Sequence, residues 1–151
     1  RWLLQEALDD LVLRATERLL ELSAGRFSLE SDDGDFWIRD HRNADERRSV
    51  RSLSGGETFL ASLALALALA ENVAELAVEG GPRLESMFLD EGFGTLDPDT
   101  LDVVATTIEE LSASGRLIGI VTHIHDLADR MPVRFEVHKD ATSARVERVE
   151  V

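Results

Sequence analysis

The chain has 151 residues, enough for one domain with a hydrophobic core, and 44% of them are apolar, as is usual for soluble globular proteins. Its formal net charge of −14 excludes attraction of the whole surface to nucleic acid, so a DNA contact would need a local basic patch. The absence of cysteine excludes disulfides and thiolate chemistry, and it agrees with the reducing cytoplasm, the location that we expect.

A helix is predicted for residues 2–22. Its apolar residues recur at intervals of three and four, the spacing of one helical face: Leu4, Leu8, Leu11, Ala15, Leu19 and Leu22. That face packs either on this domain or on a partner helix at the end of a coiled coil, and three heptads do not decide between the two. Because the chain starts inside this pattern without a basic leader, we expect a fragment entered within a helix.

Residues 25–40 alternate between apolar and polar side chains on either side of an Asp-Asp-Gly triplet at 32–34. This pattern predicts a β-hairpin with its turn at the triplet. Phe36 and Trp37 occupy successive strand positions, so their side chains point to opposite faces, and packing is favoured over stacking on DNA.

A loop is predicted for residues 41–52, which contain four arginines: Arg42, Arg47, Arg48 and Arg51. Two interpretations of these arginines are open. The favoured one is a solvated loop whose charges are partly neutralised by its own acids, and the other is a patch that contacts phosphates.

A second long helix is predicted for residues 53–76. Leucine and alanine alternate from Leu63 onward, which could suggest a strand, but alanine is poor in strands and no β-branched residue interrupts the run before Val73. The uninterrupted apolar stretch is shorter than the roughly 18 residues that a membrane span needs. We therefore predict a buried core helix and no membrane segment.

The next part of the chain has the pattern of a strand, a helix and a strand. Residues 85–91 form a short apolar run that ends in acids, and residues 97–115 form an amphipathic helix with Pro98 near its first turn. Residues 116–123 form a second apolar run. This order predicts a parallel βαβ unit, and hence an α/β fold.

Acids and a histidine follow the two predicted strands. Asp90 and Glu91 end the first strand, and His123 follows the second. Ligands gather beyond the carboxyl ends of strands in such sheets, so these residues are candidates for a site. Chance is the alternative, because acids and histidines commonly follow strands.

A short helix at residues 124–131 and two strand-like segments at 134–139 and 143–151 complete the chain. His125 lies two residues beyond His123 and is expected on the surface at the start of the short helix. Two histidines alone do not make a metal site, so no zinc is proposed.

The start of the second long helix carries another candidate site. Ser54 and Glu57 have the S-x-x-E spacing of a capping box, in which the hydroxyl and the carboxylate each accept a backbone amide. Gly55 and Gly56 leave the helix start without side chains, so its amides and positive dipole end are open to an anion such as a phosphate. A cap and a phosphate site are equally good interpretations of this tetrapeptide alone.

In this order the pieces resemble the second half of an ABC-type ATPase head: "LSGGE", a long helix, "MFLDE", "GTLD" and "TH". In that family "LSGGE" is the signature motif, "MFLDE" is the Walker B strand, "GTLD" is the D-loop and the histidine of "TH" is the switch histidine. Transporters of the superfamily usually follow the Walker B acids with Pro-Thr or Pro-Ser, whereas this chain has "DEGFGTLD". With "RSLSGGETF" before it and "IGIVTHIHDLADRMP" after it, the wording resembles the SbcC-type DNA-repair ATPases, relatives of the SMC proteins. The resemblance covers residues 50–137 strongly and the opening helix more loosely.

The resemblance implies a role for each candidate residue. Asp90 would hold Mg²⁺, through a water, and Glu91 would be the general base that activates the attacking water. His123 would contact the γ-phosphate of ATP, and Asp97 would touch the opposite active site across a dimer of heads. The signature residues would face the nucleotide of the partner head: Ser54, Gly55, Gly56 and Glu57. Close carboxylates tolerate one another when a divalent cation shares their site.

The phosphate-cradling G-x-x-x-x-G-K-[ST] loop is missing, since the only lysine is Lys139. The resemblance implies that an N-terminal lobe supplies this Walker A loop across a long antiparallel coiled coil. Residues 1–24 would be the end of that coil and residues 25–151 the C-terminal lobe. We therefore predict that the fragment alone neither binds ATP appreciably nor hydrolyses it.

By the same resemblance, the complete protein would form a head-to-head dimer that regulates an SbcD-type nuclease on double-stranded DNA. Three alternatives remain at this stage. They are another SMC-like ATPase, the nucleotide-binding domain of a transporter, and a non-catalytic structural module in which Asp90 and Glu91 could be replaced without loss of function.

Overall fold

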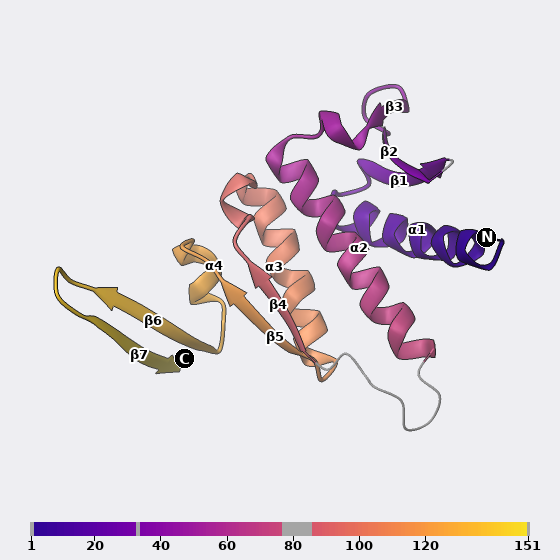
Figure 1. Ribbon diagram of the computed structural model, residues 1–151. Coiled ribbons are helices and arrows are strands. Elements are labelled where there is room, and N and C mark those ends of the chain that lie inside the picture. Colours follow the sequence, from indigo (N-terminus) through magenta and orange to yellow (C-terminus); the bar gives the residue numbers. More distant parts are fainter. Residues whose placement is uncertain (1, 33, 77–85, 151) are drawn as a thin grey trace.

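The computed structural model describes residues 2–32, 34–76 and 86–150, and it has the predicted α/β fold (Figure 1). Its elements in chain order are α1 (Trp2–Leu22), β1 (Phe27–Asp32), β2 (Asp35–Asp40), β3 (Glu46–Ser49), the 3-10 helix η1 (Val50–Ser52), α2 (Gly55–Leu76), β4 (Ser86–Asp90), the 3-10 helix η2 (Phe93–Thr95), α3 (Pro98–Ala113), β5 (Leu117–Val121), α4 (His125–Asp129), β6 (Val133–Lys139) and β7 (Ala144–Glu150).

Helix α1 packs on this domain with the face that the leucine spacing predicts. Ala15, Leu19 and Leu22 are fully buried in the core that α1 shares with α2 and β1, and Leu8 and Leu11 pack against that core. The side chain of Leu4 lies outside the described residues. The C-terminal half of the helix therefore packs on the core that is formed with α2 and β1.

The predicted hairpin is confirmed. Strands β1 and β2 are antiparallel, with Asp32 opposite Asp35, and Gly34 has a φ of +86° in the turn. Asp33, the middle residue of the predicted turn, lies outside the described residues.

The predicted loop at 41–52 is wrong in part, because it contains β3 and η1. Strand β3 pairs antiparallel with β2, which makes a three-stranded sheet in the order β1-β2-β3. Its sequence, Glu-Arg-Arg-Ser, has no apolar residue to reveal a strand. The free edge of β2 supplies the backbone partners, and acids on neighbouring elements pair with the two arginines.

Helix α2 is the central helix of the core, as predicted. By length and composition alone, Gly55–Val73 could cross a membrane, and 44% of that window is buried inside the structure. Six of its buried residues belong to the core cluster that also contains residues of α1, the β1–β3 sheet and α3: Leu60, Ala61, Leu63, Ala64, Leu67 and Ala68. The apolar character of α2 therefore has an explanation in the core of this lobe.

Strands β4 and β5 are parallel and are joined through α3, so the βαβ prediction is confirmed. One face of this pair packs on the core through Met87, Leu89, Ile118 and Ile120. The opposite face exposes Phe88, Leu117 and Val121. The two strands thus carry apolar residues on both faces, but of these only one face is covered by residues 2–32, 34–76 and 86–150.

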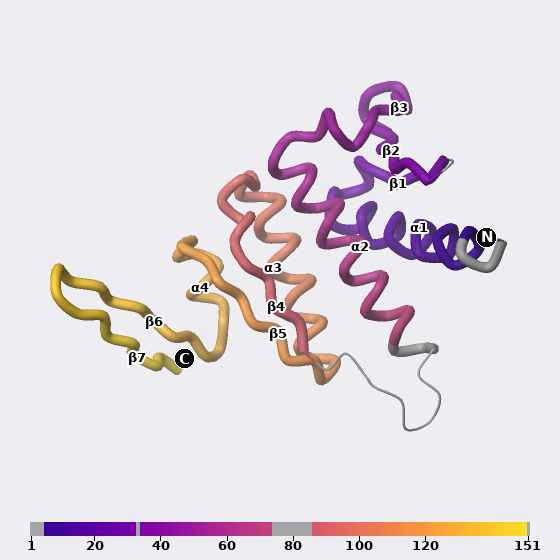
Figure 2. The backbone as a smooth tube through the Cα atoms, in the orientation of Figure 1, coloured from indigo at the N-terminus to yellow at the C-terminus, as the bar shows by residue number. Residues whose placement is uncertain are grey.

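The last two strands form an antiparallel hairpin, β6–β7, which projects at the end of the molecule opposite α1 (Figure 1). The backbone trace reaches it through the short helix α4 (Figure 2). His125 is exposed at the first residue of α4, as predicted. Val137 and Val146 are opposite one another in the hairpin and both are exposed.

Candidate functional site

The candidate site lies at the carboxyl edge of the parallel pair β4–β5. Asp90 is the last residue of β4 and is opposite Val121, the last residue of β5. The backbone N–H of Glu91 donates to the carbonyl of Val121 at 2.9 Å, which extends the pairing by one residue. The predicted convergence of the two strand ends is therefore present.

Glu91 and His123 are in direct contact at this edge. Nδ1 of His123 lies 2.9 Å from Oε2 of Glu91. Both side chains are exposed, at 50% for Glu91 and 70% for His123. A carboxylate and an imidazole held together at an open edge can orient a water molecule and exchange a proton with it.

The backbone at Glu91 is strained. Its φ is +58°, a left-handed conformation that costs an L-residue roughly 1 kcal/mol or more. Gly92 follows with a φ of +96°, and together they turn the chain sharply out of β4 into η2. Strain of this kind is concentrated at functional sites, because only the surrounding structure keeps it in place.

The turn after Glu91 is fixed by an aromatic contact with α2. A Cβ at Gly92 would lie 2.3 Å from the ring of Phe59, which excludes any larger residue without rearrangement. Phe59 also meets the buried ring of Phe93 edge to face, with 4.9 Å between ring centroids. The start of α2 and the turn beyond β4 are therefore one packed unit.

Gly55 and Gly56 contact the same turn. A Cβ at Gly56 would lie 2.8 Å from the carbonyl oxygen of Thr95, and one at Gly55 would lie 3.3 Å from Cγ2 of Thr95. Close packing is thus a second reason for the two glycines, which the sequence did not reveal. Among the described residues, none accepts a hydrogen bond from the amides of Gly55 or Gly56, so the helix start also keeps its donors for an anion.

The capping box at the start of α2 is confirmed. The hydroxyl of Ser54 accepts from the N–H of Glu57 at 3.3 Å, and Oε2 of Glu57 accepts from the N–H of Ser54 at 2.9 Å. The two residues therefore hold each other's orientation at the first turn.

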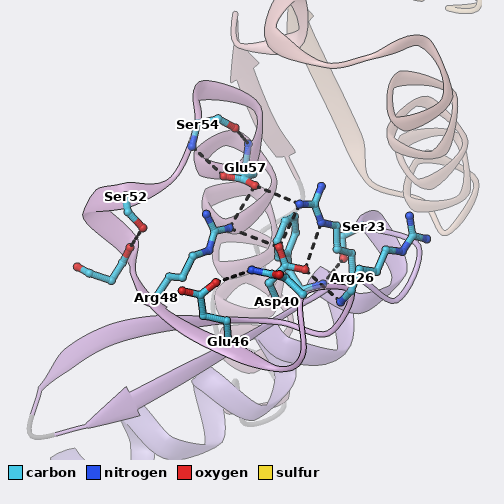
Figure 3. A network of polar contacts seen from close by, with 12 residues as sticks. Ser23, Arg26, Asp40, Glu46, Arg48, Ser52, Ser54 and Glu57 are labelled. Carbon is cyan, nitrogen blue, oxygen red and sulfur yellow. Dashed lines mark hydrogen bonds and ion pairs between the residues drawn. The ribbon is translucent and has the colours of Figure 1, made fainter.

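Glu57 also belongs to a charged cluster that sequence reasoning missed (Figure 3). Its Oε1 accepts from Nη2 of Arg48 at 3.3 Å and lies 3.9 Å from Nη2 of Arg26. Asp40, at the end of β2, pairs with the same two arginines at 3.0 Å for Arg26 and 3.7 Å for Arg48. These residues are distant in the sequence, so no local pattern announces the cluster.

The pKa values of both carboxyl groups respond to this cluster. The hydrogen bond from Arg26 lowers the pKa of Asp40 below its usual value and outweighs the effect of burial. Burial raises the pKa of Glu57, but hydrogen bonds from Ser54 and Arg48 outweigh it, so that its pKa is also lowered. Both acids are therefore held ionised in the folded protein.

Two of the four arginines of the predicted loop, Arg47 and Arg48, form ion pairs with acids of the same chain. Arg47 pairs with Glu30 and Asp32, and its guanidinium lies 4.5 Å from the ring centroid of Trp37. Arg42 donates to the carbonyl of Ala24, which fixes its side chain but does not neutralise its charge. The ion pairs of Arg47 and Arg48 favour the interpretation in which the charges are partly balanced by acids of the same chain.

Asp97 ends the same turn and caps α3. Its carboxylate accepts from the N–H of Thr100 at 3.0 Å and from the Thr100 hydroxyl at 2.6 Å. The hydroxyl and then the N–H of Thr100 lower the pKa of Asp97. The residue is exposed, so the cap leaves it at the surface beside the candidate site.

The donor set at this edge fits Mg²⁺ as a weakly coordinated ion. No group of three or more acidic, histidine or cysteine side chains gathers among the described residues. Asp90 offers a single exposed carboxylate. This suits Mg²⁺, which keeps several waters and takes one or two protein carboxylates together with phosphate oxygens.

Comparisons with known proteins agree with this geometry. Residues 26–110 match the family described as SbcC/RAD50-like, Walker B motif. The chain is 46% identical over 150 residues to the SbcC subunit of nuclease SbcCD from Deinococcus radiodurans and 44% identical over 149 residues to that from Bacillus subtilis, covering 99% and 98% of this chain. It spans only 16% and 13% of the length of those two relatives.

The fold is that of an SMC ATPase head. A structure solved in work on ATP-driven dimerisation and DNA-stimulated activation of SMC ATPases superimposes with a TM-score of 0.76 at 17% identity, covering 98% of this chain and 88% of that one. The sequence match extends over more than half of the chain and includes the helix start at 54–57 and the turn at 90–97. The chain therefore belongs to the SbcC/RAD50-like family.

Proposed function

We propose that this chain is the C-terminal lobe of an SbcC-like DNA-repair ATPase, and that it hydrolyses ATP with Mg²⁺ when joined to an N-terminal lobe. The observation that carries the proposal is the 2.9 Å contact between Glu91 and His123 at the carboxyl edge of β4–β5. The start of α2 packs on the turn that follows Glu91. The candidate residues of the helix start and those of the β4–β5 edge therefore share one region of the surface.

Glu91 is the general base in this proposal. Its left-handed backbone aims the carboxylate across the sheet edge toward His123, where it orients a water and accepts its proton. His123 keeps its Nε2 for a phosphate oxygen while Nδ1 is engaged by Glu91. Asp90 holds Mg²⁺, which neutralises charge on the phosphates when it is bound.

The start of α2 serves the nucleotide of a second head. Ser54 and Glu57 fix the first turn, and the amides of Gly55 and Gly56 are available for a phosphate. Asp97 lies at the surface beside this helix start, where it would meet the partner head. Each site is then completed by the other head, so ATP binding drives dimerisation and hydrolysis reverses it.

The uncovered face of β4–β5 supports an N-terminal lobe of the same protein as a partner. Phe88 is 74% exposed, and Leu117 and Val121 are also exposed on that face. Apolar surface of this kind marks an interface. In our proposal the Walker A loop comes with that lobe, residues 1–24 lead to it through a coiled coil, and residues 25–151 are the C-terminal lobe.

The partners of the complete protein are proposed from its relatives. Those relatives are named as the SbcC subunit of the nuclease SbcCD, so we propose an SbcD-type nuclease as a partner and double-stranded DNA as its substrate. A cytoplasmic location is part of the same proposal.

A substitution in the complete protein tests the catalytic role. Glu91→Gln keeps the size of the side chain but removes the base, so ATP hydrolysis should fall by about 100-fold or more while ATP-dependent dimers accumulate. Steady-state phosphate release and size-exclusion chromatography with ATP measure the two effects. Glu110→Gln, at an exposed position on α3, is the matched control and should leave both unchanged.

The same experiment separates the alternatives. Unchanged turnover in Glu91→Gln removes the residue from its role, whereas no ATP turnover in the unsubstituted complete protein favours a non-catalytic structural module. The SbcC/RAD50-like match argues against a transporter domain, and a nuclease partner that co-purifies with the complete protein would distinguish it from other SMC-like ATPases.

The isolated chain tests the need for the other lobe. Calorimetry with Mg-ATP should detect no saturable binding to the 151-residue chain, because its described residues offer amides and single carboxylates but no phosphate cradle. Saturable binding to this chain would contradict the proposed division of the head.

A further inference from the structure

Asp40 is a buried carboxylate between two arginines. It is 3% exposed at the end of β2, and it accepts hydrogen bonds from the Arg26 guanidinium and from the backbone N–H of Arg42. A buried ion is tolerated only where partners compensate for its lost hydration, and Arg26 and Arg48 supply that compensation here.

The two arginines extend from Asp40 to the start of α2. Arg48 lies 3.7 Å from Asp40 and 3.3 Å from Glu57, so it bridges the two acids. Arg26 makes the same bridge at 3.0 Å and 3.9 Å. Two carboxylates and two guanidiniums balance each other, and the bridge spans β2, β3 and α2 (Figure 3).

Glu57 is the link between this cluster and Ser54. One oxygen of its carboxylate faces the arginines, and the other accepts from the N–H of Ser54 at 2.9 Å. The rotamer of Glu57 is therefore set from the cluster side, and it sets the position of Ser54 in turn.

We propose that Asp40 is a positioning residue for the Ser54–Glu57 helix start, acting through Arg26 and Arg48 on the carboxylate that orients Ser54. The inference rests on the proposed function, in which this helix start binds the nucleotide of a second head. Asp40 touches no nucleotide itself. Its contribution is to share the two guanidiniums, so that neither draws Glu57 away from the Ser54 amide.

The test is Asp40→Asn in the complete protein. Asparagine keeps the size of the side chain but removes its charge, which leaves two guanidiniums facing the single carboxylate of Glu57. We expect association of labelled heads, measured by energy transfer with a non-hydrolysable ATP analogue, to weaken about tenfold or more. Affinity for the analogue should not change at protein concentrations too low for association, because the phosphate cradle belongs to the other lobe.

Glu30→Gln is the matched control. Glu30 also sits between two arginines of the same sheet, Arg39 and Arg47, but it has no link to Ser54. It should leave head association unchanged. Because Glu30 is more exposed than Asp40, thermal unfolding of both variants is followed to separate a folding defect from a positioning defect.

A second variant covers the case in which Asp40→Asn does not fold. Arg48→Gln removes the shorter of the two arginine contacts to Glu57 and leaves that of Arg26, and it should weaken head association in the same direction. In a protein that already carries Glu57→Gln, the added Asp40→Asn should have little further effect, since both act through one carboxylate.

Ser54→Asp distinguishes a failure of the positioning role of Asp40 from a failure of the proposed function. Aspartate still caps a helix but repels a phosphate, so head association should be lost. If the heads of the unsubstituted protein do not associate with one another in the presence of the analogue, the proposed function fails. A combination of three results overturns the positioning role while the proposed function stands. The heads of the unsubstituted protein associate, Ser54→Asp abolishes this association, and Asp40→Asn changes it no more than Glu30→Gln does.

Discussion

Two regions of the protein differ in how far their large apolar side chains are buried. In the first, the sheet β1–β3 and the start of α2, apolar side chains such as Ile38 are buried, and the acid Asp40 is buried with its arginine partners. In the second, the pair β4–β5 and the hairpin β6–β7, large apolar side chains such as Phe88 and Phe135 are exposed. The first region covers its apolar side chains and pairs its buried acid, whereas the second leaves large apolar side chains exposed.

The difference indicates which partner each region has. A region whose apolar groups are covered and whose buried acid is paired is suited to a contact that forms and breaks, and Ser54 at its border is a candidate for such a contact. A region with uncovered apolar strands is suited to a permanent interface, such as one with the N-terminal lobe that we propose. Glu91 precedes Gly92, which packs against Phe59 of α2, so the contact of Glu91 with His123 lies close to where the two regions meet.

The largest effect that separates the regions should come from truncating one apolar side chain in each. Ile38→Ala removes a side chain that is 1% exposed and should cost about 2–5 kcal/mol of the free energy of unfolding. Phe88→Ala removes a larger side chain that is 74% exposed, and it should change that free energy by no more than about 0.5 kcal/mol. Urea unfolding of the 151-residue chain measures both.

Protein concentration is the control for this pair. If Phe88→Ala proves as costly as Ile38→Ala at low concentration, the β4–β5 face is covered within the chain, and the contrast between the regions is wrong. If the cost appears only at high concentration, Phe88 is buried by self-association instead.

A smaller effect is expected at the border between the regions, where two glycines provide a matched pair. Gly92 and Gly115 have φ values of +96° and +93°, but only Gly92 faces another side chain, Phe59. Gly115→Ala should cost about 1–2 kcal/mol from backbone strain alone. Gly92→Ala should cost about 1–3 kcal/mol more, because the new methyl group overlaps the ring. Equal losses in urea unfolding would mean that Phe59 moves aside freely and does not fix the turn.

Local patterns in the sequence predicted the elements that their own side chains specify: the leucine and alanine content predicted α2, the alternation predicted β1 and β2, and the two apolar runs predicted the strands around α3. The resemblances at 54–57 and 90–97 predicted the family that the comparison shows, and the roles of the individual site residues stay predictions. Strand β3 was not predicted because Arg47 and Arg48 show no apolar alternation, and that strand exists because the edge of β2 pairs with it.

The contacts across the chain were beyond local patterns. The contact of Gly56 with Thr95 and the bridge from Asp40 to Glu57 join residues that are distant in the sequence. The exposure of Phe88 was equally hidden, because a strand apolar on both faces has the same sequence whether one face or both are covered. Only the arrangement of elements reveals which face remains open.

The smallest expected effect concerns a local exception in the second region. Asp140, in the turn of the β6–β7 hairpin, accepts from the N–H groups of Thr142 and Ser143 at 2.8 and 2.7 Å. These bonds, with the N–H of Thr142 first, lower the pKa of Asp140 from 3.8 to about 2. Because the folded-state pKa is the lower one, the carboxylate stabilises the turn fully above about pH 4, and this contribution disappears as the pH falls to about 2.

Hydrogen exchange at the Thr142 and Ser143 amides across this pH range measures that loss. In Asp140→Asn the side chain still accepts hydrogen bonds but has no charge to lose, so the extra pH dependence of protection at these two amides should be absent. The remainder of the lobe should respond alike in both proteins, because the side-chain hydrogen bonds of Asp140 lie within its own turn. A pH dependence that survives in Asp140→Asn would show that the titration of another group opens the turn. The turn would then be no exception within the second region, because its own contacts would not hold it.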